Sequence, residues 1–72
     1  MAAAAAGELA GARELFAAVV HWCPLDAEAR NALAMACHQL GDAEAARAHW
    51  AAVLARSPRD PMATAGLAAS AG

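Results

Sequence analysis

Five side chains of this 72-residue sequence belong to types that ligate metal ions or act as nucleophiles. They are three histidines and two cysteines: His21, Cys23, Cys37, His38 and His49. Zinc sites use paired ligands such as C-x2-C with H-x3-5-H, and neither His21-x-Cys23 nor Cys37-His38 has that spacing. We therefore expect no metal and no cofactor, and histidines on three different helices, mostly on outer faces. A small metal or redox protein built on the two cysteines is the weakest alternative.

The two cysteines are expected to stay reduced. Cys23 precedes a proline and should lie in a turn. Cys37 lies about ten residues into the next helix, which is roughly 15 Å along the helix axis. A disulfide needs Cα atoms within ~7 Å of each other. Two free thiols indicate a reducing compartment, so we expect a cytoplasmic protein with Cys37 as a small core residue, and a reactive thiol at Cys23 is the less favoured alternative.

Several function classes find no support in the sequence. It has no Ser/His/Asp order, glycine-rich phosphate loop or paired carboxylates in an apolar setting, so we expect no enzyme. The net charge is −2 and the five basic residues, all arginine, are dispersed, which argues against nucleic-acid binding. No bulky apolar run approaches the ~20 residues of a membrane span, and the start lacks the basic region of a signal peptide. The alanine and arginine bias suggests a bacterial, GC-rich coding preference.

The composition favours helices, because most of the 61% apolar residues are alanine, the best helix former. Apolar residues at three- and four-residue steps predict helices over four ranges: 8–22, 27–40, 43–56 and 61–70. Asp26, Asp42 and Asp60 would cap the last three. Residues 1–6, closed by Gly7, would form the last turn of a separate helix or a frayed end. The expected fold class is all-α, with four antiparallel helices.

The chain also repeats itself at an offset of 34 residues. Turn residues and other positions coincide: Gly7/Gly41, Arg13/Arg47, Val19/Val53, Pro24/Pro58, Asp26/Asp60 and Leu33/Leu67. Two further pairs are conservative: Phe16/Trp50 and Val20/Leu54. A period of this length built of helix, turn and helix is typical of a solenoid repeat. Residues 1–72 would then be a single domain, divided into a half repeat 7–25, a full repeat 26–60 and a half repeat 61–72.

This pattern resembles the tetratricopeptide repeat, whose signature runs W-x2-L-G-x2-Y, then A-x3-F, then P. The full repeat carries the elements Leu33-Ala34, Ala46-x3-Trp50 and Pro58. The half repeat before it carries the elements Ala12-x3-Phe16 and Pro24. The sequence departs from the family at Arg30 and Thr64, where the family prefers a large apolar residue, and at Cys37, where it prefers tyrosine.

The two tryptophans stand at different places in the repeat. Trp50 matches the aromatic position of the signature and should be a core residue. Trp22 ends a predicted helix, at the position that corresponds to Arg56. We expect Trp22 in the core as well, with contact to a partner as the alternative. Gly66 lies inside the last predicted helix and weakens that assignment.

The resemblance implies a right-handed solenoid of about two repeats, whose first helices line a concave groove for a peptide or partner protein. The groove positions would be Glu28, Asn31, Met35, His38, Gln39, Met62 and Ala65. It implies a non-catalytic adaptor, chaperone or assembly subunit. The alternative is a structural accessory subunit that stabilises a larger enzyme complex through its convex face. Because repeats bury their faces only against neighbours, we expect apolar surface at both ends and binding to a larger partner or a second copy.

Overall fold

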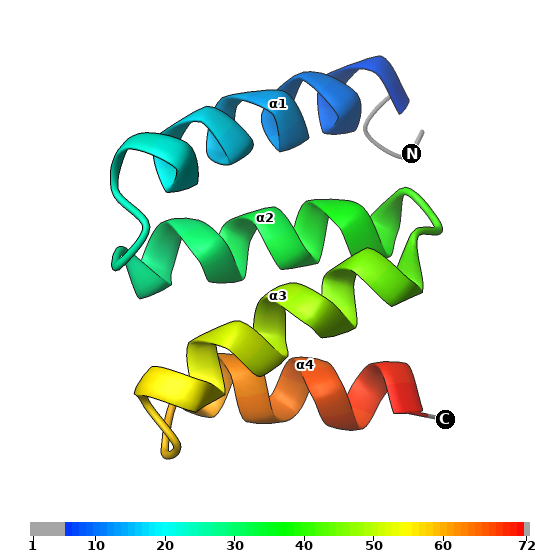
Figure 1. The fold of residues 1–72 in the computed structure, drawn as a ribbon. Coiled ribbons are helices and arrows are strands. Elements are labelled where there is room, and N and C mark those ends of the chain that lie inside the picture. Colours follow the sequence, from blue (N-terminus) through cyan, green and yellow to red (C-terminus); the bar gives the residue numbers. More distant parts are fainter. Residues whose placement is uncertain (1–5, 72) are drawn as a thin grey trace.

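Four helices make up the protein, which the computed structural model describes over residues 6–71. They are α1 (Ala6–Trp22), α2 (Ala27–Gln39), α3 (Ala43–Arg56) and α4 (Pro61–Ala71). Successive helices run in opposite directions (Figure 1). The all-α prediction is confirmed, and each helix boundary lies within two residues of the predicted one.

The turns that follow α1 and α3 have the same hydrogen bonds. The amide of Asp26 donates to the carbonyl of Cys23 at 3.0 Å, and the amide of Asp60 donates to the carbonyl of Ser57 at 3.0 Å. In both turns a proline directly follows the residue whose carbonyl accepts: Pro24 follows Cys23, and Pro58 follows Ser57. The fixed φ of proline suits this second position of a turn. The Asp26 and Asp60 carboxylates then cap α2 and α4 by accepting from the amide three residues later. The 34-residue repeat is therefore visible in the backbone.

A different turn joins α2 to α3. Gly41 has φ of 90°, the left-handed conformation that glycine adopts without a steric cost. Its amide donates to the carbonyl of His38 at 3.0 Å, and the Asp42 amide donates to the carbonyl of Cys37 at 2.9 Å. This is the Schellman pattern that ends many helices. Asp42 then caps α3 through the amide of Ala45 at 3.1 Å.

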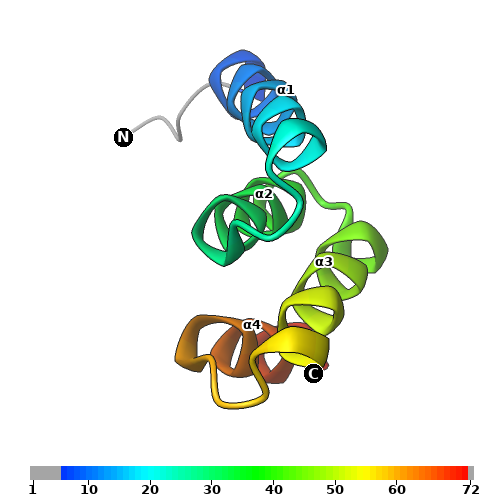
Figure 2. The ribbon, with the colours of Figure 1, turned by 60° about the vertical axis from the view of Figure 1, so that its left-hand side comes forward.

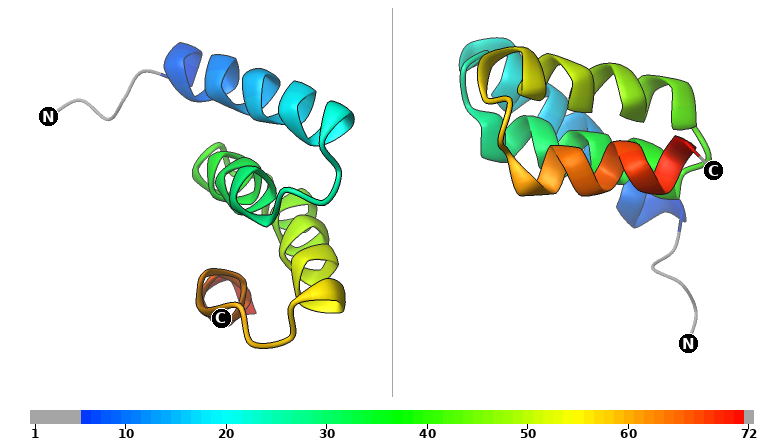
Figure 3. Two further views of the ribbon diagram at one scale, coloured as in Figure 1. Left: turned by 90° about the vertical axis from the view of Figure 1, so that its left-hand side faces the viewer. Right: turned by 90° about the horizontal axis from the view of Figure 1, so that it is seen from below.

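The helices stack in a zigzag rather than around a single centre. Seen along the helices, α2 and α4 lie on one side of the stack and α3 lies on the other (Figures 2 and 3). Helix α2 packs against both α1 and α3, α4 packs against α3, and a few residues of α2 and α4 also meet. Each helix therefore packs mainly against its neighbours in the chain, as in a solenoid.

The core lies between α2, α3 and α4 and is built around Trp50, which is 1% exposed. Small residues let the helices approach it closely: Ala34, Ala46 and Ala63 are fully buried. Helix α1 adds Val20 to this cluster, with Phe16 and Val19 half-buried against it. The predicted core role of Trp50 is confirmed.

Gly66 has a packing role that the sequence did not reveal. A Cβ atom built on Gly66 would overlap the six-membered ring of the Trp50 indole. The absence of a side chain thus lets α4 lie against this ring. One repeat earlier Phe16 corresponds to Trp50 and Ala32 corresponds to Gly66, so a smaller ring stands beside a larger neighbour. Phe16 and Ala32 line the same hollow.

Two expectations for α1 are wrong. Trp22 is 80% exposed instead of buried, because α2 packs on the face of α1 that carries Phe16, Val19 and Val20 and leaves the other face open. Gly7 does not end a separate helix: it lies within α1, without the positive φ of such an end. The rest of that predicted turn, residues 1–5, lies outside the described residues. The cysteines are free as predicted, Cys37 buried and Cys23 exposed.

Candidate protein-binding surface

One side of α2 presents a stripe of exposed side chains. Glu28, Met35 and Gln39 are exposed, and Ala32 between them is half-buried. Glu28 and Met35 are seven residues apart, Met35 and Gln39 four, and Ala32 and Met35 three. These spacings place all four on one face of a helix. Met35 is 37% exposed, which is unusual for a large apolar side chain at the middle of a packed helix.

Helix α4 continues this surface. Met62 is 56% exposed, and Ala65 is also exposed. In the 34-residue register they correspond to Glu28 and Asn31 of α2. Helices α2 and α4 lie on the same side of the stack (Figure 3). Five of the seven predicted groove residues are thus solvent-accessible on these two helices: Glu28, Met35, Gln39, Met62 and Ala65.

Asn31, the sixth, is used inside the fold. It is 5% exposed, and its side-chain Nδ2 donates to both carboxylate oxygens of Asp60 at 3.3 and 3.4 Å. Asp60 at the same time accepts from the amide of Ala63 at 3.0 Å. The buried amide therefore ties α2 to the start of α4. Its Oδ1 atom has no hydrogen-bond partner among the described residues.

His38, the seventh, lies on the side of α2 that meets α3. Its ring centroid is 5.8 Å from that of Trp50, and the planes are tilted by 54°. The Nδ1 atom is buried and has no hydrogen-bond partner among residues 6–71. The other two histidines are separate from it, with His21 exposed on α1 and His49 half-buried on α3. The described residues contain no group of three or more metal-ligating side chains.

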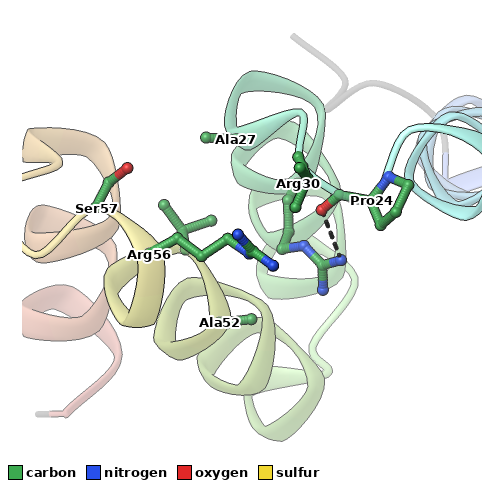
Figure 4. Close-up of a pocket in the computed structure, with 8 residues that line it drawn as sticks. Pro24, Ala27, Arg30, Ala52, Arg56 and Ser57 are labelled. Atoms are coloured by element: carbon green, nitrogen blue, oxygen red, sulfur yellow. Dashed lines mark hydrogen bonds between the residues drawn. The ribbon is translucent and has the colours of Figure 1, made fainter.

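A small cationic hollow of about 120 Å³ lies between the start of α2 and the end of α3 (Figure 4). Arg30 and Arg56 both reach into it, and Arg30 donates to the carbonyl of Pro24 at 3.3 Å. Ala27, Ala52 and Val53 supply apolar lining. Sequence reasoning did not single out this pair of arginines. The available signal was Arg30 itself, which stands where the family prefers a large apolar residue.

A second hollow of about 380 Å³ lies between α1 and α3, over α2. Val20, Leu33 and Cys37 are among its lining residues, together with His49. Burial lowers the pKa of His49 below its ordinary value of 6.5, and the charge of Arg30 lowers it further, against the opposing effect of Asp42. Burial also raises the pKa of the Cys37 thiol, which Arg13 partly offsets. Both shifts favour the neutral form of the side chain, which suits packing.

No helix within residues 6–71 is long and apolar enough to cross a membrane.

Comparison with known proteins agrees with this geometry. A family model described as tetratricopeptide repeat matches residues 3–69. No curated protein and no solved structure matches the chain. The structure agrees with this match: the helices are paired, the turns after α1 and α3 both contain a proline and an aspartate, and an aromatic residue packs against small neighbours. The chain belongs to the tetratricopeptide repeat family.

Proposed function

We propose that this chain is a non-catalytic module that binds a peptide or partner protein through the exposed stripes of α2 and α4. The observation that supports this most is the pair of exposed methionines, Met35 on α2 and Met62 on α4, since these two helices lie on one side of the stack. An unbranched, polarisable methionine adapts to partners of different shape, and such residues are common at binding surfaces. In the cell the module would act as an adaptor, a chaperone or an assembly subunit.

The surface has a chemistry that restricts its partner. Met35, Met62 and Ala65 are apolar, whereas Glu28 and Gln39 at the edges are polar, and Glu28 is negatively charged. We expect a partner segment whose apolar residues are flanked by a basic residue that pairs with Glu28.

The fold holds this surface in one arrangement. Because the Asn31 amide binds the Asp60 carboxylate, α2 cannot move away from the start of α4 without breaking these part-buried hydrogen bonds. A preorganised surface binds more tightly because less conformational freedom is lost on association. We place the module in the cytoplasm, since an exposed thiol at Cys23 persists in a reducing compartment.

Affinity capture with matched variants tests this proposal. Met35→Arg combined with Met62→Arg should abolish capture of the partner, identified by mass spectrometry with the wild-type chain. Ala48→Arg combined with Ala55→Arg alters exposed positions of α3 and is the control, which should retain the partner. Loss of capture only in the α3 variant would instead support the alternative, an accessory subunit that uses its convex face. Capture unchanged in both variants would contradict the proposed surface.

A further inference from the structure

The face of α1 turned away from α2 carries an exposed apolar stripe, here called the α1 outer face. It consists of four residues at helical spacing: Gly11, Leu15, Ala18 and Trp22. All four are exposed, Leu15 by 63% and Trp22 by 80%. Within residues 6–71, α1 packs against α2 alone. A row of exposed apolar side chains on an open helix face is a candidate for contact with another molecule or segment.

The internal repeat shows what kind of element fits this face. At an offset of 34 residues, the α1 outer face corresponds to Ala45, His49, Ala52 and Arg56 of α3. These are residues with which α3 lines the two hollows that it shares with α2. The α1 outer face is therefore the counterpart of the α3 surface that receives α2. It has the geometry to receive a helix in the position of α2.

Helix α4 presents the counterpart of α2 itself. The residues of α2 that line these two hollows include Ala27, Arg30 and Leu33. The buried Ala34 lies on the same face of the helix, four residues after Arg30 and seven after Ala27. The counterparts of the four α2 residues at the same offset are Pro61, Thr64, Leu67 and Ala68. We call these four the α4 outer face. Ala34 is fully buried, whereas Ala68 is exposed and Leu67 is half-buried. The described chain thus contains one receiving face, on α1, and one matching inserted face, on α4.

At three positions the side chains on these two faces are neutral where their counterparts are ionisable. His49 corresponds to Leu15, Arg56 to Trp22 and Arg30 to Thr64. At these three positions an ionisable residue of the α2–α3 contact is replaced by a neutral one, and on α1 the replacements are large and apolar. On α4 the face is made of small residues around one leucine. A ridge of Leu15 and Trp22 can therefore pack over Thr64 and Ala68 without burying a charge.

We propose that the α1 outer face of one molecule binds the α4 outer face of a second copy. Together α4 of one copy and α1 of the next would form a helix pair equivalent to α2 and α3. The two surfaces differ, so the contact is heterologous, and association continues from copy to copy into a chain or ring. This contact does not involve Met35 or Met62, so it is independent of partner binding at the α2–α4 surface.

Two single substitutions and their mixture test the proposal by analytical ultracentrifugation. Leu15→Glu blocks the α1 outer face, and Ala68→Glu blocks the α4 outer face; both residues are exposed, so each variant retains the helical circular dichroism of the wild type. We expect the mass of the wild type to rise with concentration. Each substitution would bury an unpaired carboxylate in the contact and should weaken self-association more than about tenfold. An equimolar mixture of the two variants should form a 1:1 dimer, because each retains the face that the other lacks.

The control is Ala48→Glu, which adds the same charge at an exposed position of α3 outside both faces and should associate like the wild type. Tryptophan fluorescence gives a second readout. Trp50 is already buried in the single molecule, so a blue shift with increasing concentration reports the burial of Trp22. A two-fold contact between α1 faces would leave Ala68→Glu self-associating and would overturn the proposal. A wild type that stays monomeric at every concentration would also overturn the proposal. In that case a helix of different sequence would be what covers the α1 outer face.

Discussion

At the scale of single residues, the contact between Trp50 and Gly66 shows how one position limits another. The Trp50 ring is almost completely buried. Gly66 leaves room for it only because it has no Cβ atom. A glycine inside a helix costs up to ~1 kcal/mol relative to alanine, and here the packing of a tryptophan compensates for that cost.

Replacing Gly66 by alanine should therefore destabilise the protein despite the better helix propensity of alanine. We expect a loss of about 1–3 kcal/mol in the free energy of unfolding, measured by urea denaturation of a dilute sample, because the new methyl group would overlap the indole. Gly11→Ala is the matched control: the space around Gly11 is open, and this variant should gain about 0.5–1 kcal/mol.

The preceding repeat suggests how to repair that variant. Phe16 and Ala32 correspond to Trp50 and Gly66, so the double variant Trp50→Phe with Gly66→Ala recreates a pairing that the protein already contains. The smaller ring makes room for the methyl group. We expect a favourable coupling of at least ~1 kcal/mol in the double-mutant cycle. Additive effects of the two substitutions would show that the overlap is relieved elsewhere.

His49 should make stability depend on pH. Its pKa is lowered in the folded protein, mainly by burial and then by Arg30, so the unfolded chain binds a proton more readily than the folded one. Stability from the neutral imidazole is present above the ordinary pKa of 6.5 and is lost as pH falls through the lowered folded value. The free energy of unfolding should thus decline on acidification below about pH 6.5. The His49→Gln variant should show a smaller dependence of the free energy of unfolding on pH in this range. An identical dependence on pH in the variant and the wild type would exclude His49 as its source.

At the scale of helices, the caps explain why the boundaries could be predicted so closely. Asp26, Asp42 and Asp60 each accept from an amide three residues later, and the turns before α2 and α4 contain proline. These interactions are local, so a short stretch of sequence is sufficient to specify them. Asp60 differs from the other two because it also accepts from the buried Asn31 side chain.

That difference predicts unequal effects of the same substitution. Asp42→Ala removes a helix cap and should cost about 0.5–2 kcal/mol. Asp60→Ala removes a cap and also leaves the Asn31 Nδ2 donor buried without a partner, which should add about 1–3 kcal/mol. Thermal or urea unfolding of both variants measures the difference. In an Asn31→Ala background the excess should disappear, and if it persists, the hydrogen bond between α2 and α4 is not its cause.

At the scale of the whole molecule, the packing of α2 between α1 and α3 determines which thiol is accessible. Cys37 is buried within this packing, whereas Cys23 is exposed in the turn after α1. A chromogenic disulfide should modify Cys23 rapidly. It should reach Cys37 only when the helices separate, since burial also raises the pKa of this thiol and lowers its thiolate fraction.

The Cys23→Ser variant isolates this second reaction. Its single thiol should react at a rate that increases with urea in proportion to the population of the opened form. The proposed contact between copies covers α1 and should slow the reaction as protein concentration rises. Rapid labelling of Cys37 without denaturant would contradict its burial. The same measurement on Leu15→Glu should lose the dependence on protein concentration.

The sequence by itself determined the helices, the turns between them and the 34-residue register, because caps, prolines and Gly41 act through hydrogen bonds and dihedral angles close by in the chain. Only the tertiary structure decided which of two tryptophans is buried, because Trp22 and Trp50 both lie on amphipathic helices and differ in the helices that pack beside them. It also decided that Asn31 binds Asp60, 29 positions further along the chain, and that Gly66 makes room for an indole from another helix. Such contacts depend on the relative placement of whole helices, which local patterns do not specify.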